Sequence, residues 1–240
     1  MSENEAQLTV VIPCFNEADN LDQLVRDLAV EIMKNRFKVV LVDNGSVDKT
    51  QEVLARSLSD CDKIISKDIK VLHLLENQNY GGGIKAGIFG CETEYVGWFH
   101  ADLQFHASEI SKLMTGMKSG ATLIKGNRKS RSRIERMFTG GMSILSTILF
   151  QRICRDINGQ PTFYRRDFLT KFNDVPNDFS LDAYFYLMAV LKHESIVRYP
   201  VKMIPRVNGV SSWNVGFKSQ VRFSFKMIKA LFKIRTATNA

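Results

Sequence analysis

The sequence predicts an α/β fold in which helices cover both faces of a mostly parallel sheet. Short apolar stretches alternate along the chain with longer helical stretches, which is typical of βαβ units. Several apolar stretches also stop abruptly at Pro, Asp or His, which places polar side chains at the ends of buried strands. The length of 240 residues suits one substantial domain of this kind.

The first half of the chain shows this alternation most clearly. We predict strands at residues 8–12, ended by Pro13, and at 37–42, 70–75 and 95–99. Helices are predicted at about 16–34 and 48–59, and a glycine-rich turn at 81–83 leads into a third. In open α/β sheets ligands bind beyond the carboxyl ends of the strands, so the residues that follow these strands are site candidates.

The second half predicts a strand at 121–125, a basic segment at 125–136 and an apolar helix at 138–153. A helix opens near Phe179, and a strand follows at 196–204. We place a domain boundary at 215, so that residues 1–215 form the α/β domain and 216–240 form a C-terminal amphipathic helix.

The net charge of +8 belongs to the C-terminal end of the chain. Residues 195–240 hold nine of the 33 Lys and Arg residues and none of the 25 Asp and Glu residues. On the last helix the cations fall within an arc of about 80° beside an apolar arc, and they are Lys218, Arg222, Lys226, Lys229 and Lys233. This pattern favours an anionic membrane surface, with core packing and snorkelling lysines as the alternative.

Composition also predicts the compartment. The four cysteines, at 14, 61, 91 and 154, show neither metal-site nor disulfide spacing, which suits a reducing compartment. We find no signal peptide, no apolar stretch long enough to span a bilayer and no nucleic-acid recognition motif. We therefore expect a cytoplasmic protein, peripheral on the cytoplasmic face of a membrane, that binds no nucleic acid.

Metal-binding residue types follow the apolar stretch that ends at Phe99. Asp102 offers a carboxylate and Gln104 a carbonyl oxygen, which suit a divalent cation that bridges two phosphates. His100 is a poor ligand for Mg²⁺ and an acceptable one for Mn²⁺. The alternative is a solvated strand end with a capping Asp.

Six motifs together resemble family 2 inverting glycosyltransferases with the GT-A fold. They lie, in order, at 11–17, 42–50, 79–83, 100–104, 158–161 and 205–213, so that the resemblance covers roughly residues 8–215. Within that family the sequence is most similar to the polyprenyl-phosphate mannose and glucose synthases, including dolichol-phosphate mannose synthase.

The resemblance implies a binding site for a nucleotide-diphosphate sugar. The residues implied in donor binding are Pro13, Phe15, Glu17, Asp43, Gly82, Lys85, Asp102, Arg128, Asn158 and Gln160. The family often has Tyr at position 15 and Asp at positions 44 and 100, where this chain has Phe15, Asn44 and His100. These departures leave open the base that is recognised and the choice between Mn²⁺ and Mg²⁺.

The resemblance also implies a lipid-linked acceptor, most readily a polyprenyl phosphate such as undecaprenyl or dolichyl phosphate. The residues implied at the acceptor phosphate are Arg133, Arg136, Arg206, Ser211 and Ser212. Asp102, Arg128 and Arg206 are the expected catalytic residues, and Asp182 becomes a general base if the acceptor is instead a sugar hydroxyl. A catalytically silent nucleotide-sugar-binding subunit is the alternative that His100 suggests, and an integral membrane partner is left open.

Overall fold

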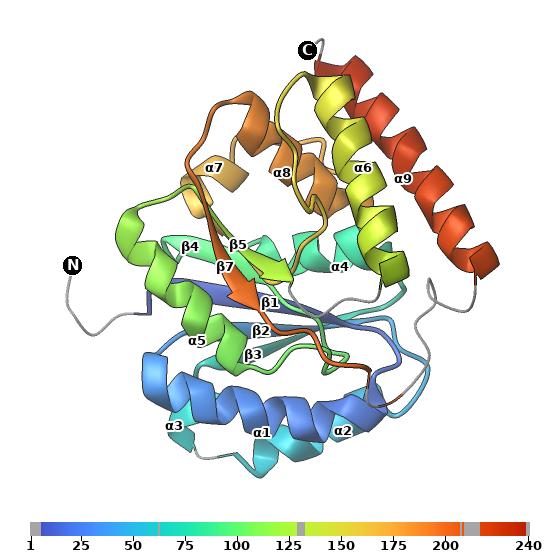
Figure 1. Cartoon of the computed structure of the whole chain (residues 1–240). Helices are drawn as coiled ribbons and strands as arrows, with labels where there is room; N and C mark the ends of the chain where they lie inside the picture. Colours follow the sequence, from blue (N-terminus) through green and yellow to red (C-terminus); the bar gives the residue numbers. More distant parts are fainter. Residues whose placement is uncertain (1–5, 62, 129–132, 207, 209–216, 239–240) are drawn as a thin grey trace.

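The structure, a computed structural model, describes residues 6–61, 63–128, 133–206, 208 and 217–238. In these ranges one sheet runs through the centre of the molecule (Figure 1), with the strand order β3-β2-β1-β4-β6-β5-β7. The strands are β1 Leu8–Cys14, β2 Lys38–Asn44, β3 Ile69–Leu74, β4 Tyr95–Trp98, β5 Leu123–Arg128, β6 Thr162–Arg165 and β7 Ile196–Val201.

The sheet is mostly parallel, as predicted. Strands β1 to β4 run parallel to one another, and β5 runs parallel to β7. Among the described strands only β6 is antiparallel, both to β4 and to β5. The carboxyl ends of β1, β2 and β4 therefore meet at one edge of the sheet, where the sequence predicted the site.

Helices cover both faces of the sheet. One core lies between the sheet and α1 Ala18–Asn35, α2 Thr50–Ser59, α3 Lys63–Ser66 and α5 Ser108–Met114, and η1 Thr115–Ser119 follows α5. The other lies beneath α4 Asn79–Ile88, α6 Arg133–Phe150, α7 Arg166–Leu169, α8 Ser180–Leu191 and α9 Phe217–Thr238. Strand β1 serves both cores, because Leu8, Val10 and Ile12 face the first and Val11 faces the second.

The predicted end of the first strand at Pro13 is wrong, because β1 continues to Cys14. The carbonyl of Val11 accepts a hydrogen bond from the Phe99 N–H, so Val11 and Pro13 both direct their backbone groups toward the β4 side. Strand β4 has already ended at Trp98, so no partner there requires the N–H group that Pro13 lacks.

The glycine-rich segment is also not a turn before a helix. Gly81, Gly82 and Gly83 lie inside α4, near its N-terminus. A Cβ on Gly81 would lie 2.6 Å from the Pro176 carbonyl oxygen, and one on Gly83 would lie 3.0 Å from the side chain of Asn44. The glycines let α4 approach its neighbours closely.

The helices α6 and α9 lie side by side over the second core (Figure 1). Helix α6 begins at Arg133, earlier than the predicted start at 138. Helix α9 buries Met227, Leu231 and Ile234 in the core that it shares with α8. Among the described residues, none of the helices combines the length and apolar character that a membrane crossing requires. The boundary placed at residue 215 stays a prediction.

Candidate active site

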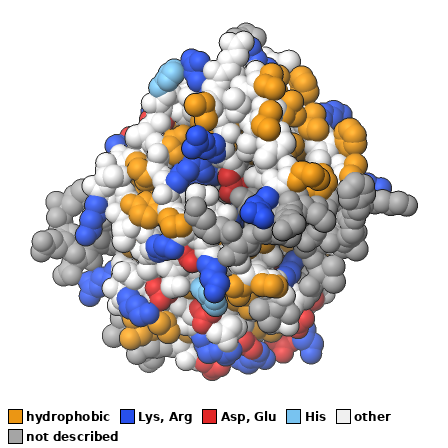
Figure 2. Space-filling model, viewed as in Figure 1, with side chains coloured by type: hydrophobic (Ala, Val, Ile, Leu, Met, Phe, Trp, Pro, Cys, Tyr) orange, Lys and Arg blue, Asp and Glu red, His pale blue; other side chains and the backbone are white. Residues whose placement is uncertain are grey.

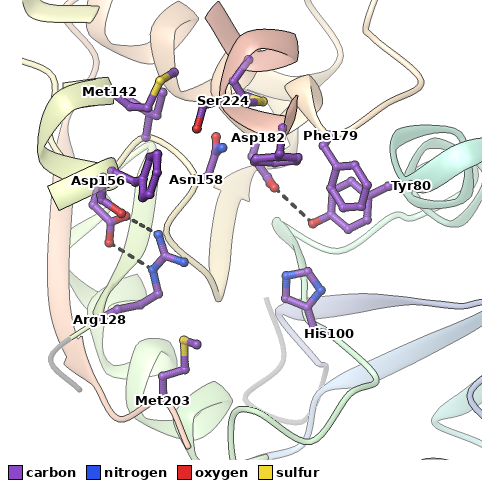
Figure 3. Close-up of a pocket in the computed structure, with 15 residues that line it drawn as sticks. Tyr80, His100, Arg128, Met142, Asp156, Asn158, Phe179, Asp182, Met203 and Ser224 are labelled. Carbon is purple, nitrogen blue, oxygen red and sulfur yellow. Dashed lines mark hydrogen bonds and ion pairs between the residues drawn. The ribbon is translucent and has the colours of Figure 1, made fainter. Parts of the chain in front are cut away.

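A pocket of about 170 Å³ opens at the carboxyl edge of the sheet beneath α6 and α9 (Figure 3). Its polar lining comes from the ends of β4 and β5, from the turn at 156–158 and from α4, α6, α8 and α9, and its apolar lining comes largely from α6 and α9. The lining residues are Tyr80, His100, Arg128, Phe138, Thr139, Met142, Asp156, Ile157, Asn158, Phe179, Asp182, Met203, Phe223, Ser224 and Met227.

Asp182, in the first turn of α8, is a buried carboxylate on the wall of this pocket. Its Oδ1 accepts hydrogen bonds from Trp98 Nε1 at 2.5 Å and from Gln160 Nε2 at 2.7 Å. Its Oδ2 accepts one from the Tyr80 hydroxyl at 3.1 Å. Burial and the charge of Asp182 raise the pKa of Tyr80 well above its ordinary value, so that this hydroxyl stays a donor. The network holds Asp182 in one orientation.

Arg128, the last residue of β5, pairs with Asp156 on one side of the pocket (Figure 3). Two nitrogens of the guanidinium bond the two carboxylate oxygens, Nη2 to Oδ1 at 2.5 Å and Nε to Oδ2 at 3.3 Å. Such a two-point contact fixes the plane of the guanidinium. Arg128 therefore reaches the pocket as an oriented cation, and the turn that carries Asp156 also brings the half-buried Asn158 to the pocket.

Aromatic rings form another wall of the pocket. Tyr80 stacks on Phe179 with ring centroids 4.7 Å apart, and the His100 ring lies at 5.7 Å from Tyr80. His100 thus lines the pocket through its ring. The proposed contact of His100 with a metal ion stays a prediction.

The predicted metal ligands Asp102 and Gln104 lie in the loop after β4, and both are partly buried. Asp102 Oδ1 accepts the backbone N–H of Gln104 at 3.1 Å, and Leu103 between them has a positive φ of 57°. The described residues contain no cluster of three His, Cys, Asp or Glu side chains that would hold a metal alone. One carboxylate and one amide oxygen fit a cation that takes its other ligands from phosphate and water.

The predicted nucleoside residues follow β1 and β2. Phe15 is exposed, Pro13 is partly buried, and Asp43 is fully buried. Burial would raise the pKa of Asp43, but hydrogen bonds from Ser46, Gln51 and His73 hold it below its ordinary value. Asp43 is therefore an ionised acceptor whose two oxygens already have partners.

Arg206 lies beside the predicted nucleoside residues rather than in the pocket. Its Nη2 donates to Glu17 Oε1 at 2.5 Å, while Asn20 donates to the other carboxylate oxygen. The neighbouring Asn208 donates to the Asp19 carbonyl oxygen at 3.1 Å. Arg206 was predicted to bind the acceptor phosphate, and Glu17 was predicted to bind the nucleotide sugar. Their ion pair joins these two predicted sites, which sequence spacing did not anticipate.

The other predicted site residues are only partly placed. The Gly82 N–H donates to the Asn177 carbonyl oxygen, and Lys85 Nζ donates to the Val175 carbonyl oxygen at 3.0 Å. Both groups thus bond the segment that precedes α8. Arg136 is an exposed residue of α6. The side chain of Arg133, and Ser211 and Ser212 entirely, lie outside the described residues.

Sequence reasoning missed several pocket residues. Asp156 and Tyr80 line the pocket, and Trp98 donates to the pocket residue Asp182. None of the three was proposed, although Tyr80 lies inside a motif and the other two adjoin one. Their contacts join residues far apart in the chain, so no spacing reveals them. The apolar lining from Phe138 and Met142 required knowing which face of the helix turns inward.

Comparison with known proteins gives a consistent result. The sequence pattern of glycosyl transferase family 2 matches residues 9–176. An undecaprenyl-phosphate 4-deoxy-4-formamido-L-arabinose transferase of Pseudomonas syringae is 32% identical over 128 residues, which are 52% of this chain and 36% of that protein. The enzyme of the same name from Salmonella choleraesuis is 27% identical over 150 residues, 61% of this chain and 43% of that protein. The chain spans less than half the length of these curated relatives.

Solved structures share the fold. Glucosyl-3-phosphoglycerate synthase of Mycobacterium tuberculosis, in complex with Mn²⁺, UDP and glucosyl-3-phosphoglycerate, superposes with a TM-score of 0.73 at 13% identity. The match covers 96% of this chain and 80% of that one. A complex of the same synthase with Mg²⁺ and UDP gives a TM-score of 0.74 with the same coverage. The predicted GT-A fold class is confirmed.

Proposed function

Because the chain belongs to glycosyl transferase family 2, we propose that it transfers a hexose from a nucleotide-diphosphate sugar to polyprenyl phosphate with inversion at the anomeric carbon. The family match confirms the resemblance drawn from the motifs. The names of the curated relatives, undecaprenyl-phosphate sugar transferases, support a lipid-phosphate acceptor. The observation that carries the proposal is the composition of the pocket.

The pocket is suited to an amphiphile with an anionic head. Arg128 supplies a cation at its polar end, and Asn158 supplies polar atoms beside it. Helix α6 contributes Phe138 and Met142 to the apolar lining, and α9 contributes Phe223 and Met227. An acceptor with a charged phosphate and an isoprenoid chain would contact both the polar end and the apolar lining. A sugar acceptor has no apolar chain to contact that lining.

The proposed chemistry requires positioning and charge rather than proton removal. A polyprenyl phosphate oxygen is already ionised at neutral pH, and it attacks the anomeric carbon as the bond from that carbon to the diphosphate oxygen breaks. Arg128, oriented by Asp156, holds phosphate close to this centre. A bound Mn²⁺ or Mg²⁺ would neutralise the leaving diphosphate, and Asp102, Gln104 and His100 are the residues that would hold it.

The outer sides of α6 and α9 support binding at an anionic membrane surface. Hydrophobic side chains gather over these two helices (Figure 2), and the exposed ones are Met137, Ile144, Ile148, Phe225 and Phe232. Arg222, Lys226, Lys229 and Lys233 of α9 are exposed beside them. Apolar side chains flanked by cations fit a cytoplasmic membrane face, where the acceptor resides, alone or with an integral membrane partner.

The test is a panel of nucleotide sugars with purified protein, with and without undecaprenyl phosphate, in Mn²⁺, Mg²⁺ or chelator. We expect release of nucleoside diphosphate and formation of a lipid-linked sugar only when both the lipid and a cation are present. Arg128→Gln should abolish most of this transfer. Arg165→Gln is the matched control, since Arg165 makes an exposed pair with Asp167. Failure of every donor to react with the lipid would refute the proposal.

One observation favours a second candidate, transfer to a sugar hydroxyl. Asp182 is a buried, oriented carboxylate on the pocket wall, which is where a general base for a hydroxyl acceptor would stand. The two candidates differ in their need for this carboxylate.

A further inference from the structure

Lys125 is a fully buried lysine in the middle of β5, and none of the motifs accounts for it. Burial, with Arg198 nearby, lowers the pKa of Lys125 to about 7. Its Nζ lies 5.3 Å from the centre of the Tyr186 ring. Lysine is rarely buried without a specific partner, because removing its charge from water is costly.

The partners of Lys125 are backbone carbonyls of a single turn. Its Nζ donates to the Gly159 carbonyl oxygen at 2.7 Å and to the Ile157 carbonyl oxygen at 3.2 Å. The neighbouring residue of β5 secures the same turn, because the Gly126 N–H donates to the Pro161 carbonyl oxygen at 2.8 Å. Strand β5 therefore holds residues 156–161 from below.

That turn carries three of the polar groups of the site. Asp156 orients Arg128, Asn158 lines the pocket, and Gln160 donates to Asp182. A shift of the turn would displace all three together. Asp182 also accepts a hydrogen bond from the indole N–H of Trp98. If Gln160 moves, Asp182 should move with it, and the length of the bond from Trp98 should change.

We propose that Lys125 is a positioning residue for the transfer reaction, acting by fixing the 156–161 turn through its two bonds to Ile157 and Gly159. The proposal rests on the proposed function for its catalytic consequence, but the geometric consequence can be measured in the unliganded protein. Lys125 lies beneath the turn and not in the lining of the pocket, so it acts through these residues and not on the substrate.

The first experiment is NMR of the indole N–H groups in the ligand-free full chain. The chain has two tryptophans, so a Trp213→Phe background leaves the Trp98 resonance alone. Lys125→Met removes the donors while preserving most of the side-chain length, and we expect the Trp98 N–H resonance to move upfield as its bond to Asp182 lengthens. Lys125→Gln, which keeps an N–H donor, should move it less. Lys38→Met, at the exposed start of β2, is the matched control.

The second experiment measures transfer to undecaprenyl phosphate. Misplaced groups of this kind cost roughly 10- to 100-fold, so we expect Lys125→Met to lower kcat/KM by that factor, mainly through kcat. Combined with Asn158→Ala it should cost less than the product of the two separate losses, because both act through one turn. A purely structural lysine would leave the two losses multiplicative.

Three results would overturn the proposal: an unmoved Trp98 resonance in folded Lys125→Met, multiplicative losses in the double variant, or failure of both Lys125 variants to fold. The last would show that the lysine is needed for folding itself. If the wild-type protein transfers no sugar to the lipid, the proposed function fails, while the Trp98 resonance still decides whether Lys125 places the turn.

Discussion

Replacing Asp182 by Asn separates the two acceptor classes. Asn has nearly the same shape, so it removes the charge and the basic oxygen while filling the same space. The Asn carbonyl oxygen can accept the bonds from Trp98 and Gln160 that Oδ1 accepts now. Its amide group would face the Tyr80 hydroxyl, which can reverse its role and accept.

The structural cost of Asp182→Asn should therefore be modest. Each bond to a charged acceptor contributes about 1 kcal/mol more than a neutral one, and the Tyr80 O–H loses its carboxylate acceptor, so we expect a loss of about 2–3 kcal/mol of folding free energy. The catalytic cost depends on the acceptor. Loss of a general base costs roughly 100- to 10,000-fold in rate, whereas a phosphate acceptor that needs no base should lose less than about tenfold.

The assay is single-turnover release of nucleoside diphosphate with undecaprenyl phosphate, beside calorimetric binding of the nucleotide to the same samples. Intact nucleotide binding with turnover within about tenfold of the wild type supports the lipid-phosphate acceptor. A loss of more than about 100-fold with unchanged binding would refute the reasoning that the acceptor needs no general base. Asp167→Asn, at an exposed carboxylate, is the matched control.

The remaining predictions concern Arg128, Lys125 and Gly81. Arg128→Lys keeps a cation but loses the two-point contact with Asp156, so it should retain more transfer than Arg128→Gln and less than the wild type in the same release assay. The pKa of Lys125 in the folded protein is lowered to about 7. Between about pH 7 and the ordinary lysine pKa, the folded protein therefore binds fewer protons than the unfolded chain. The free energy of unfolding should rise by about 2 kcal/mol between about pH 7 and 9, relative to Lys125→Met in urea titrations; a parallel pH dependence of the two proteins would contradict this sign. Gly81→Ala would press a methyl group against the Pro176 carbonyl oxygen, and thermal unfolding should show a loss of about 1–3 kcal/mol.

Much of the fold was predictable because its strands are short apolar stretches flanked by polar residues. The strands at 37–42 and 95–99 were placed within two residues of β2 and β4. The strand end at Pro13 was misplaced because local propensity cannot show that the neighbouring strand has already ended. The glycines of α4 were misread for a similar reason, since what they accommodate is remote in the chain, namely the Pro176 segment at Gly81 and Asn44 at Gly83.

Four of the predicted site residues line the pocket, namely His100, Arg128, Asn158 and Asp182. Of these, only His100 and Arg128 lie at or just after the end of a strand. The position of Arg206 was not predictable in this way. Its ion pair with Glu17 depends on the path that the chain takes after β7. The pairing of Arg128 with Asp156 and the burial of Lys125 beneath the same turn were likewise invisible to spacing.

The amino-acid sequence by itself determined the alternation of strands and helices in the first half of the chain, the ordered family motifs and the cationic stripe of the last helix. Each of these follows from local periodicity or from residues adjacent in the chain. Only the tertiary structure decided that α6 and α9 join the polar sheet edge to make one amphiphilic pocket. It also decided that Asp182 is held by Trp98, Gln160 and Tyr80. The physical reason is that such contacts depend on packing between elements far apart in the chain, which periodicity does not encode.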